Sequence, residues 1–159
     1  MFALPGHAEE WGCYDPQPGH PTEAEKKRFI SEISPLAVMA ERTHGVPAAV
    51  ISAMAIAESG YGWTRTALEA HNLFGWKFYS SSSASGRNYY VLSCQPAEDK
   101  NNKYVKFSDT ADAIDFVAGK LATLPAYLSD TRKYLQARQS GKSVADASKD
   151  WINADRKAA

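Results

Sequence analysis

A single carboxylate ends the most apolar stretch of the chain. The run AAVISAMAIAE, residues 48–58, is apolar at every position except Ser52 and Glu58. Glu58 follows Met54 by four positions and Ile51 by seven, which places it on the same helix face as these apolar residues. A carboxylate on a buried face is costly, and a carboxyl group that keeps its proton there could protonate a leaving oxygen. On spacing alone, an equally good interpretation is that Glu58 emerges into solvent at the helix end.

Local signals predict the helices around Glu58. Pro47 suits the first position of a helix over residues 48–58, and Gly60 suits its C-terminal end. The sequence Thr22-Glu23-Ala24-Glu25 has the spacing of a capping box, so an earlier helix begins at about Thr22. Ser34-Pro35 indicates a break, and we expect two linked helical pieces up to His44-Gly45.

The rest of the chain predicts one small hairpin among helices. Runs rich in aromatic and β-branched residues at 88–94 and 103–107 indicate two strands, joined by a long connection. Further helices are expected at about 64–70, from Ser108 or Asp109 to Pro125, at 127–138 and at 143–155. We therefore predict an α+β, mainly helical fold, with an irregular tail at 1–21 and a single domain at 22–159.

Two motifs resemble those of a known family. Glu58-Ser59-Gly60-Tyr61-Gly62 is followed by His71-Asn72-Leu73-Phe74-Gly75-Trp76-Lys77. This pair is similar to the motifs of glycoside hydrolase family 73, the bacterial N-acetylglucosaminidases that cut peptidoglycan. The resemblance covers roughly residues 25–130 and implies a lysozyme-like fold, with a helical lobe and a small β-hairpin lobe on either side of a glycan groove.

The resemblance also implies roles for individual residues. Glu58 would be the general acid that protonates the glycosidic oxygen of a β-1,4 bond. Asn72 would offer its amide to an N-acetyl group, and Trp76 would stack on a sugar. Phe74 and Gly75 would form the groove floor, although core packing is the better interpretation for Leu73 and Phe74. The other substrate-binding residues expected by resemblance are Tyr61 and Tyr104.

A second carboxylate is needed if a base activates water on the opposite face of the sugar. The resemblance places such a group in the hairpin lobe, where Glu98 and Asp99 lie in the connection between the strands. We choose Glu98 because its longer side chain can cross a groove, although a solvated loop charge is the more common role for either residue. The alternative is assistance from the acetamido group of the substrate itself.

Two segments depart from the family pattern. Tyr104-Val105-Lys106-Phe107 stands where the family has Phe-Arg-x-Tyr, and the family's late Tyr-Ala-Thr-Asp stretch has no counterpart. These departures leave the acid assignment intact but leave two alternatives open. One is a muramidase of the same fold, and the other is a lysozyme-like module that binds peptidoglycan without cutting it.

Composition excludes several other classes. Lys and Arg number 18 and Asp and Glu number 18, so no net charge attracts nucleic acid. The longest apolar run, residues 46–57, is too short to span a membrane, which needs about 20 residues. The four histidines lack metal-site spacing, and nucleotide-binding motifs are absent, so we predict neither metal nor cofactor.

The two cysteines, Cys13 and Cys94, are either free thiols or one long-range disulfide, which would indicate an oxidising compartment. No signal peptide is visible at the N-terminus. We therefore expect action in the bacterial periplasm or cell wall after delivery by a secretion system such as type VI. In that setting the chain would be an antibacterial effector, paired with an immunity protein that occludes the groove.

Overall fold

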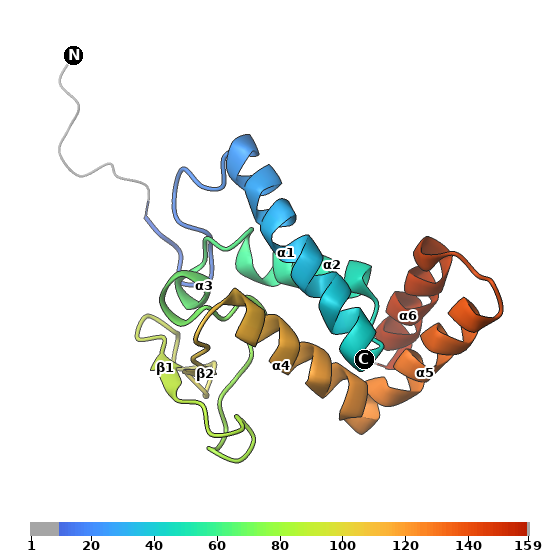
Figure 1. The fold of residues 1–159 in the computed structure, drawn as a ribbon. Coiled ribbons are helices and arrows are strands. Elements are labelled where there is room, and N and C mark those ends of the chain that lie inside the picture. Colours follow the sequence, from blue (N-terminus) through green and yellow to red (C-terminus); the bar gives the residue numbers. More distant parts are fainter. Residues whose placement is uncertain (1–9, 159) are drawn as a thin grey trace.

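The computed structural model of the chain describes residues 10–158, which form a mainly helical body with one small sheet (Figure 1). The helices and strands, in chain order, are α1 (Glu23–His44), α2 (Ala48–Ser59), α3 (Arg65–Ala70), β1 (Tyr89–Val91), β2 (Lys103–Val105), α4 (Thr110–Thr123), α5 (Pro125–Gln139) and α6 (Val144–Ala158).

Helix α1 is continuous, so the expected break at Ser34-Pro35 is wrong. Its N-terminus carries the predicted capping box between Thr22 and Glu25. Pro35 lies inside the helix on an exposed position, where water can reach the carbonyl group that its ring leaves without a donor. The hydroxyl of Ser34 donates to the carbonyl oxygen of Ile30 at 2.6 Å, which adds a bond beside the proline.

Helix α2 packs one face into the core. Val50, Ile51 and Ala55 are buried along it, and it packs against both α1 and α6. The main core cluster also takes apolar residues from α1, α4 and the segment that follows α3. The opposite face of α2, with Ala49, Ala53 and Ala57, is exposed. The buried residues Ala55 and Ser59 fix the C-terminal end of the helix.

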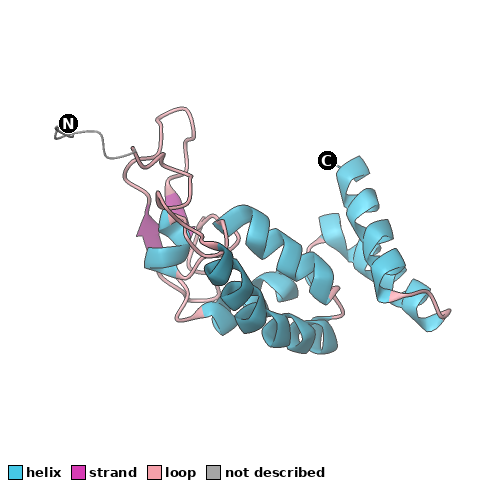
Figure 2. Ribbon diagram, turned by 90° about the horizontal axis from the view of Figure 1, so that it is seen from above, coloured by secondary structure: helices cyan, strands magenta, loops and turns pink. Residues whose placement is uncertain are grey.

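The hairpin lobe lies at one end of the molecule, and helices α5 and α6 lie at the other (Figure 2). Strands β1 and β2 are antiparallel, with Tyr90 opposite Tyr104. They have three residues each, which is shorter than the predicted runs. Lys77 forms a further isolated bridge with Tyr104, so the chain after α3 joins the small sheet.

The two last helices form a smaller apolar cluster with α2. Val50 of α2 packs there with Tyr134, Ala147 and Trp151. Within residues 10–158, no helix is both long and apolar enough to cross a membrane.

Residues 11–21, here called the strap, contain no helix or strand in the structure but pack against the body near α3 (Figure 1). The earlier part of the predicted tail, residues 1–9, lies outside the described residues.

Candidate active site

Glu58 lies on the last turn of α2, where the helix leaves the core. Its side chain is exposed, so of the two interpretations of the spacing, the structure agrees with the one in which Glu58 emerges into solvent at the helix end. The helix ends one residue later, because Gly60 adopts the left-handed conformation at φ 54°. Ser59 is fully buried and fixes the turn: its hydroxyl donates to the Ala55 carbonyl at 2.5 Å and accepts from the Gly62 amide at 2.9 Å.

A cavity of about 320 Å³ contains the Glu58 side chain in its wall. Gly75 lies beside the carboxylate: a Cβ atom built on Gly75 would be 3.7 Å from Oε2 of Glu58. The two motifs singled out in the sequence therefore meet at this point. The lining residues come from the strap, from α2 and α3, from the turn at Gly75 and from the hairpin lobe: Cys13, Tyr14, Ala57, Glu58, Thr64, Arg65, Thr66, Gly75, Leu92 and Tyr104.

Asn72 is a structural residue, which contradicts its expected contact with an N-acetyl group. It is fully buried, and its side-chain amide donates to the carbonyl oxygens of Trp76 and Val105, each at 2.9 Å. Its Oδ1 accepts from the backbone amides of Phe74 and Trp76. All of its polar capacity is thus used to close the turn at 72–76 and to join that turn to β2.

Phe74 and Trp76 have different surroundings. Phe74 is 6% exposed and belongs to the main core, as core packing predicts. Trp76 is half-buried, stands edge-on to Phe116 and lines a second cavity of about 370 Å³. Gly75 lines both cavities, so they adjoin beside Glu58. The second cavity also takes Lys77, Tyr79, Ser83, Lys120 and Leu124.

Of the two tyrosines expected to bind substrate, only Tyr104 lines the Glu58 cavity. Its hydroxyl donates to Oε1 of Gln95 at 2.7 Å, and its ring lies 4.4 Å from the Lys77 ammonium. Tyr61 turns away, with φ at 58°, and lines a different cavity beside Phe29 of α1.

Neither hairpin carboxylate lines the Glu58 cavity. Glu98 and Asp99 are both exposed on the connection between β1 and β2. Asp99 is connected to the site through Tyr14, whose hydroxyl donates to it at 3.0 Å, and it also pairs with Lys77 at 3.2 Å. Burial alone would lower the pKa of Lys77, but its contacts with Tyr104 and Asp99 outweigh that effect and raise the pKa, so the ammonium stays charged.

Tyr14 of the strap and Arg65 of α3 are among the lining residues that were not predicted from the sequence. Cys13 and Cys94 form a disulfide, with their Cα atoms 5.7 Å apart, and this bond brings Tyr14 to the cavity. The sequence left open whether the two cysteines are free or paired. A disulfide between Cys13 and Cys94 places the neighbouring Tyr14 near the hairpin connection. Nothing in the sequence around Arg65 signals its role.

Among residues 10–158, no three histidine, cysteine or acidic side chains come together as a metal site.

Comparisons with known proteins support the fold. The catalytic domain of the autolysin Auto from Listeria monocytogenes superposes with a TM-score of 0.56 at 21% identity, covering 84% of this chain and 75% of that domain. The glycoside hydrolase domain of FlgJ from Salmonella typhimurium gives 0.55 at 20% identity, covering 83% and 87%. The expected fold, a helical lobe with a small hairpin lobe, is confirmed.

In sequence, the chain is 31% identical over 110 residues to Protein bax of Escherichia coli K12, a match that covers 69% of this chain and 36% of that protein. The chain therefore matches only about a third of the length of this relative. The sequence model of the Glucosaminidase family, described as mannosyl-glycoprotein endo-beta-N-acetylglucosaminidase, matches residues 34–158. Because this match spans most of the chain, the protein carries a glycoside hydrolase domain and belongs to the Glucosaminidase family.

Proposed function

We propose that this protein hydrolyses β-1,4 glycosidic bonds of bacterial peptidoglycan as an N-acetylglucosaminidase, with Glu58 as the general acid. The observation that carries the proposal is the placement of the Glu58 carboxylate in the wall of a cavity, beside Gly75 of the second family motif. Glu58 is the one carboxylate among the described residues that line this cavity.

The position of Glu58 suits a proton donor once substrate is bound. It lies at the C-terminal end of α2, where the helix dipole disfavours negative charge. A glycan bound in the cavity would displace water from around the carboxyl group and bring the glycosidic oxygen next to it. Glu58 would then give its proton to the oxygen of the leaving sugar.

The second catalytic group remains part of the proposal. Glu98 is our choice from the sequence, and its place on the exposed connection would require the loop to move towards bound substrate. Asp99 competes for the role because it is bonded to Tyr14, which lines the cavity. The acetamido group of the substrate is the third candidate, and the presence of one carboxylate among the described wall residues supports it.

The experiment is digestion of purified peptidoglycan by the wild type and by Glu58→Gln, followed by borohydride reduction and mass spectrometry of the new sugar ends. Reduced glucosamine ends from the wild type identify an N-acetylglucosaminidase, and reduced muramic ends identify a muramidase. Loss of a general acid lowers the rate by about 10²–10⁴-fold. Glu32→Gln, an exposed acid on α1, is the matched control and should retain full activity.

The same assay separates the candidates for the second group. If a carboxylate acts as base, either Glu98→Gln or Asp99→Asn loses activity by a comparable factor. If the substrate assists, both variants remain active, and removal of the N-acetyl groups from the glycan abolishes cleavage instead.

A binding module without activity is the second candidate, and it is favoured by the presence of only one carboxylate among the described lining residues. In such a module the wild type and Glu58→Gln would bind glycan equally well, and neither would release new sugar ends. Retained binding without cleavage by the wild type would therefore overturn the hydrolase proposal.

We further propose that the protein acts outside the cytoplasm, as an antibacterial effector whose groove is occluded by an immunity protein in the producing cell. The Cys13–Cys94 disulfide supports an oxidising compartment, which is where peptidoglycan lies. Directed to the periplasm of Escherichia coli, the wild type should cause lysis and Glu58→Gln should not, whereas cytoplasmic expression of either should be harmless. Lysis by both variants would contradict the role of hydrolysis.

A further inference from the structure

The strap is fastened to the helical side of the Glu58 cavity. The Arg65 guanidinium, at the start of α3, donates to the carbonyl oxygens of Trp11, Gly12 and Cys13 at 3.1, 2.9 and 3.2 Å. It also lies 4.0 Å from the centre of the Trp11 ring. Three backbone carbonyls thus converge on one charged side chain, and such charge-assisted bonds are stronger than neutral ones. Arg65 itself lines the cavity, so the strap is fixed at its rim.

The strap also packs on the turn that directly follows Glu58. A Cβ atom at Gly60 would be only 2.3 Å from Cγ of Pro16, so the strap lies directly on the glycine of the first motif. The amide of Gln17 donates to the Trp63 carbonyl at 2.9 Å, and the His20 ring stacks on Trp63 at 3.7 Å. This second set of contacts extends the attachment to the C-terminal end of the strap.

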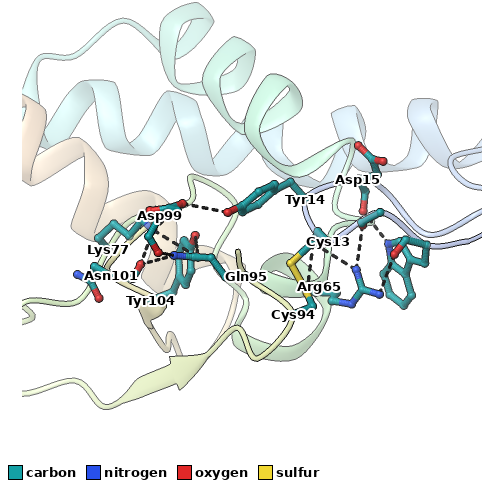
Figure 3. The surroundings of a disulfide bond; sticks show 12 residues. Cys13, Tyr14, Asp15, Arg65, Lys77, Cys94, Gln95, Asp99, Asn101 and Tyr104 are labelled. Atoms are coloured by element: carbon teal, nitrogen blue, oxygen red, sulfur yellow. Dashed lines mark hydrogen bonds and ion pairs between the residues drawn. A yellow bond between two sulfur atoms is a disulfide. The ribbon is translucent and has the colours of Figure 1, made fainter. Parts of the chain in front are cut away.

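On the other side, the strap is bonded to the hairpin lobe. Cys13 is linked covalently to Cys94, and the hydroxyl of the next residue, Tyr14, donates to Asp99 at 3.0 Å. Figure 3 shows Tyr14 extending from the strap towards Asp99, beside the disulfide. Cys13 and Tyr14 both line the Glu58 cavity. The strap therefore connects the helical wall and the hairpin wall across this cavity.

We propose that the strap closes one end of the substrate groove, and that Tyr14 is a specificity-determining residue that contacts the terminal sugar there. The second cavity, on the Trp76 side of Gly75, contains no strap residue in its lining. A linear glycan can extend in that direction. At the other end its path is blocked by the strap, which is bonded to the hairpin wall by the disulfide and to the helical wall by the hydrogen bonds of Arg65. The enzyme would then act near chain ends and release short fragments. This inference rests on the proposed function.

The strap lies outside the part of the chain that matches the family, which begins at residue 34. The closed end of the groove is therefore formed by residues outside the family match. A cavity of about 320 Å³ lies at the small end of the range for ligand pockets. The cavity on the strap side of Glu58 has room for only a short piece of glycan. This is consistent with the release of short products.

The test compares product lengths from peptide-free glycan strands cut by the wild type, by the double variant Cys13→Ser/Cys94→Ser and by Tyr14→Ala. We expect short fragments from the wild type at the earliest times. The double variant should produce long internal fragments first, because the strap is no longer tied covalently to the hairpin wall and the closed end can open on that side. Tyr14→Ala should raise KM about tenfold with kcat changed less, since it removes one aromatic contact with a sugar. Tyr89→Phe, an exposed tyrosine on β1 outside both cavities, is the control and should behave as the wild type.

Several outcomes would overturn the inference while leaving the proposed function intact. One is an unchanged pattern of product lengths in the double variant, and another is a kcat loss in Tyr14→Ala at unchanged KM. Thermal unfolding by circular dichroism checks that each variant is folded, and if the double variant is not, Tyr14→Ala decides alone.

Failure of the proposed function is recognised separately, by the absence of any cleavage by the wild type. The closed end is then tested by binding of tetra-N-acetylchitotetraose, measured calorimetrically. Affinity about tenfold weaker for Tyr14→Ala than for Tyr89→Phe supports contact with Tyr14. Equal affinities contradict it.

Discussion

On the helical side of the cavity, Glu58 is positioned by residues close to it in the sequence, whereas the hairpin side depends on residues far apart in the chain. The end of α2 is set by Gly60 and by the Ser59 hydroxyl, and α3 begins at the capping residue Thr64. The hairpin has only three residues in each strand and is tied by Asn72, by Lys77 and by the disulfide. The helical side is held by local hydrogen bonds and core packing, so loss of one bond should destabilise it little. The hairpin side is held by a few contacts between distant segments, so loss of one of them should destabilise it more.

The largest effect on stability should come from Asn72, which joins the two walls. Asn72→Ala leaves buried carbonyl and amide groups without partners, so we expect a loss of about 3 kcal/mol or more in the free energy of unfolding. Urea unfolding measures it, with Asn88→Ala, an exposed position, as the control. A loss below about 1 kcal/mol would show that the turn at 72–76 holds without this side chain.

Removal of the disulfide should loosen one wall and not the other. Cys13→Ser/Cys94→Ser should cost about 2–4 kcal/mol, since the bond closes a long loop. Hydrogen exchange read by mass spectrometry should rise in residues 11–21 and 88–107 and stay unchanged in α2. Faster exchange in α2 to the same degree would mean that the two walls are not held independently.

The Arg87–Asp112 pair gives the hairpin side a pH dependence. The bond to Arg87, at 2.6 Å, lowers the pKa of Asp112 and ties the segment before β1 to α4. Because the pKa of Asp112 is lower in the folded protein, the pair stabilises the fold above the pKa of the unfolded chain, about 3.9. This stabilisation is lost as the pH falls through the folded-state pKa. Asp112→Asn should therefore cost about 1 kcal/mol at pH 7 and little at the lowest pH.

Thermal melts at a series of pH values provide the check on Asp112→Asn. Glu32→Gln, exposed on α1, should show no such dependence. A constant difference between Asp112→Asn and the wild type at every pH would count against an ionic contribution.

A similarly small effect should come from the cap of α3. Thr64→Ala removes the side-chain acceptor for the Ala67 amide and should cost about 1 kcal/mol without faster exchange in the hairpin. Thr22→Ala removes the equivalent acceptor at α1, far from the cavity, and should cost a similar amount. A much larger loss at Thr64, spreading to β1 and β2, would show that the helical wall supports the hairpin.

This contrast also explains what the sequence predicted. Glu58 at the end of α2, the caps at Thr22 and Asp109, and the presence of a hairpin follow from spacing and local chemistry, and the structure has them. The family resemblance assigns Asn72 to substrate binding because its motif is recognisable, whereas its hydrogen-bond partner, the Val105 carbonyl, lies 33 positions away. Tyr14 and Arg65 were missed for the same reason, since their roles depend on contacts between distant segments. The continuous α1 differs because an exposed proline can be hydrated within a helix.

Gly75 lines the cavity with Glu58 and also the cavity with Trp76. Its φ of 61° disfavours any residue with a side chain, and a side chain there would stand between the two cavities, a few ångströms from the carboxylate. At Gly75, therefore, no side chain separates the Glu58 cavity from the Trp76 cavity. In the proposed hydrolase, the absence of a side chain at Gly75 would let one continuous sugar polymer occupy both cavities and pass beside Glu58.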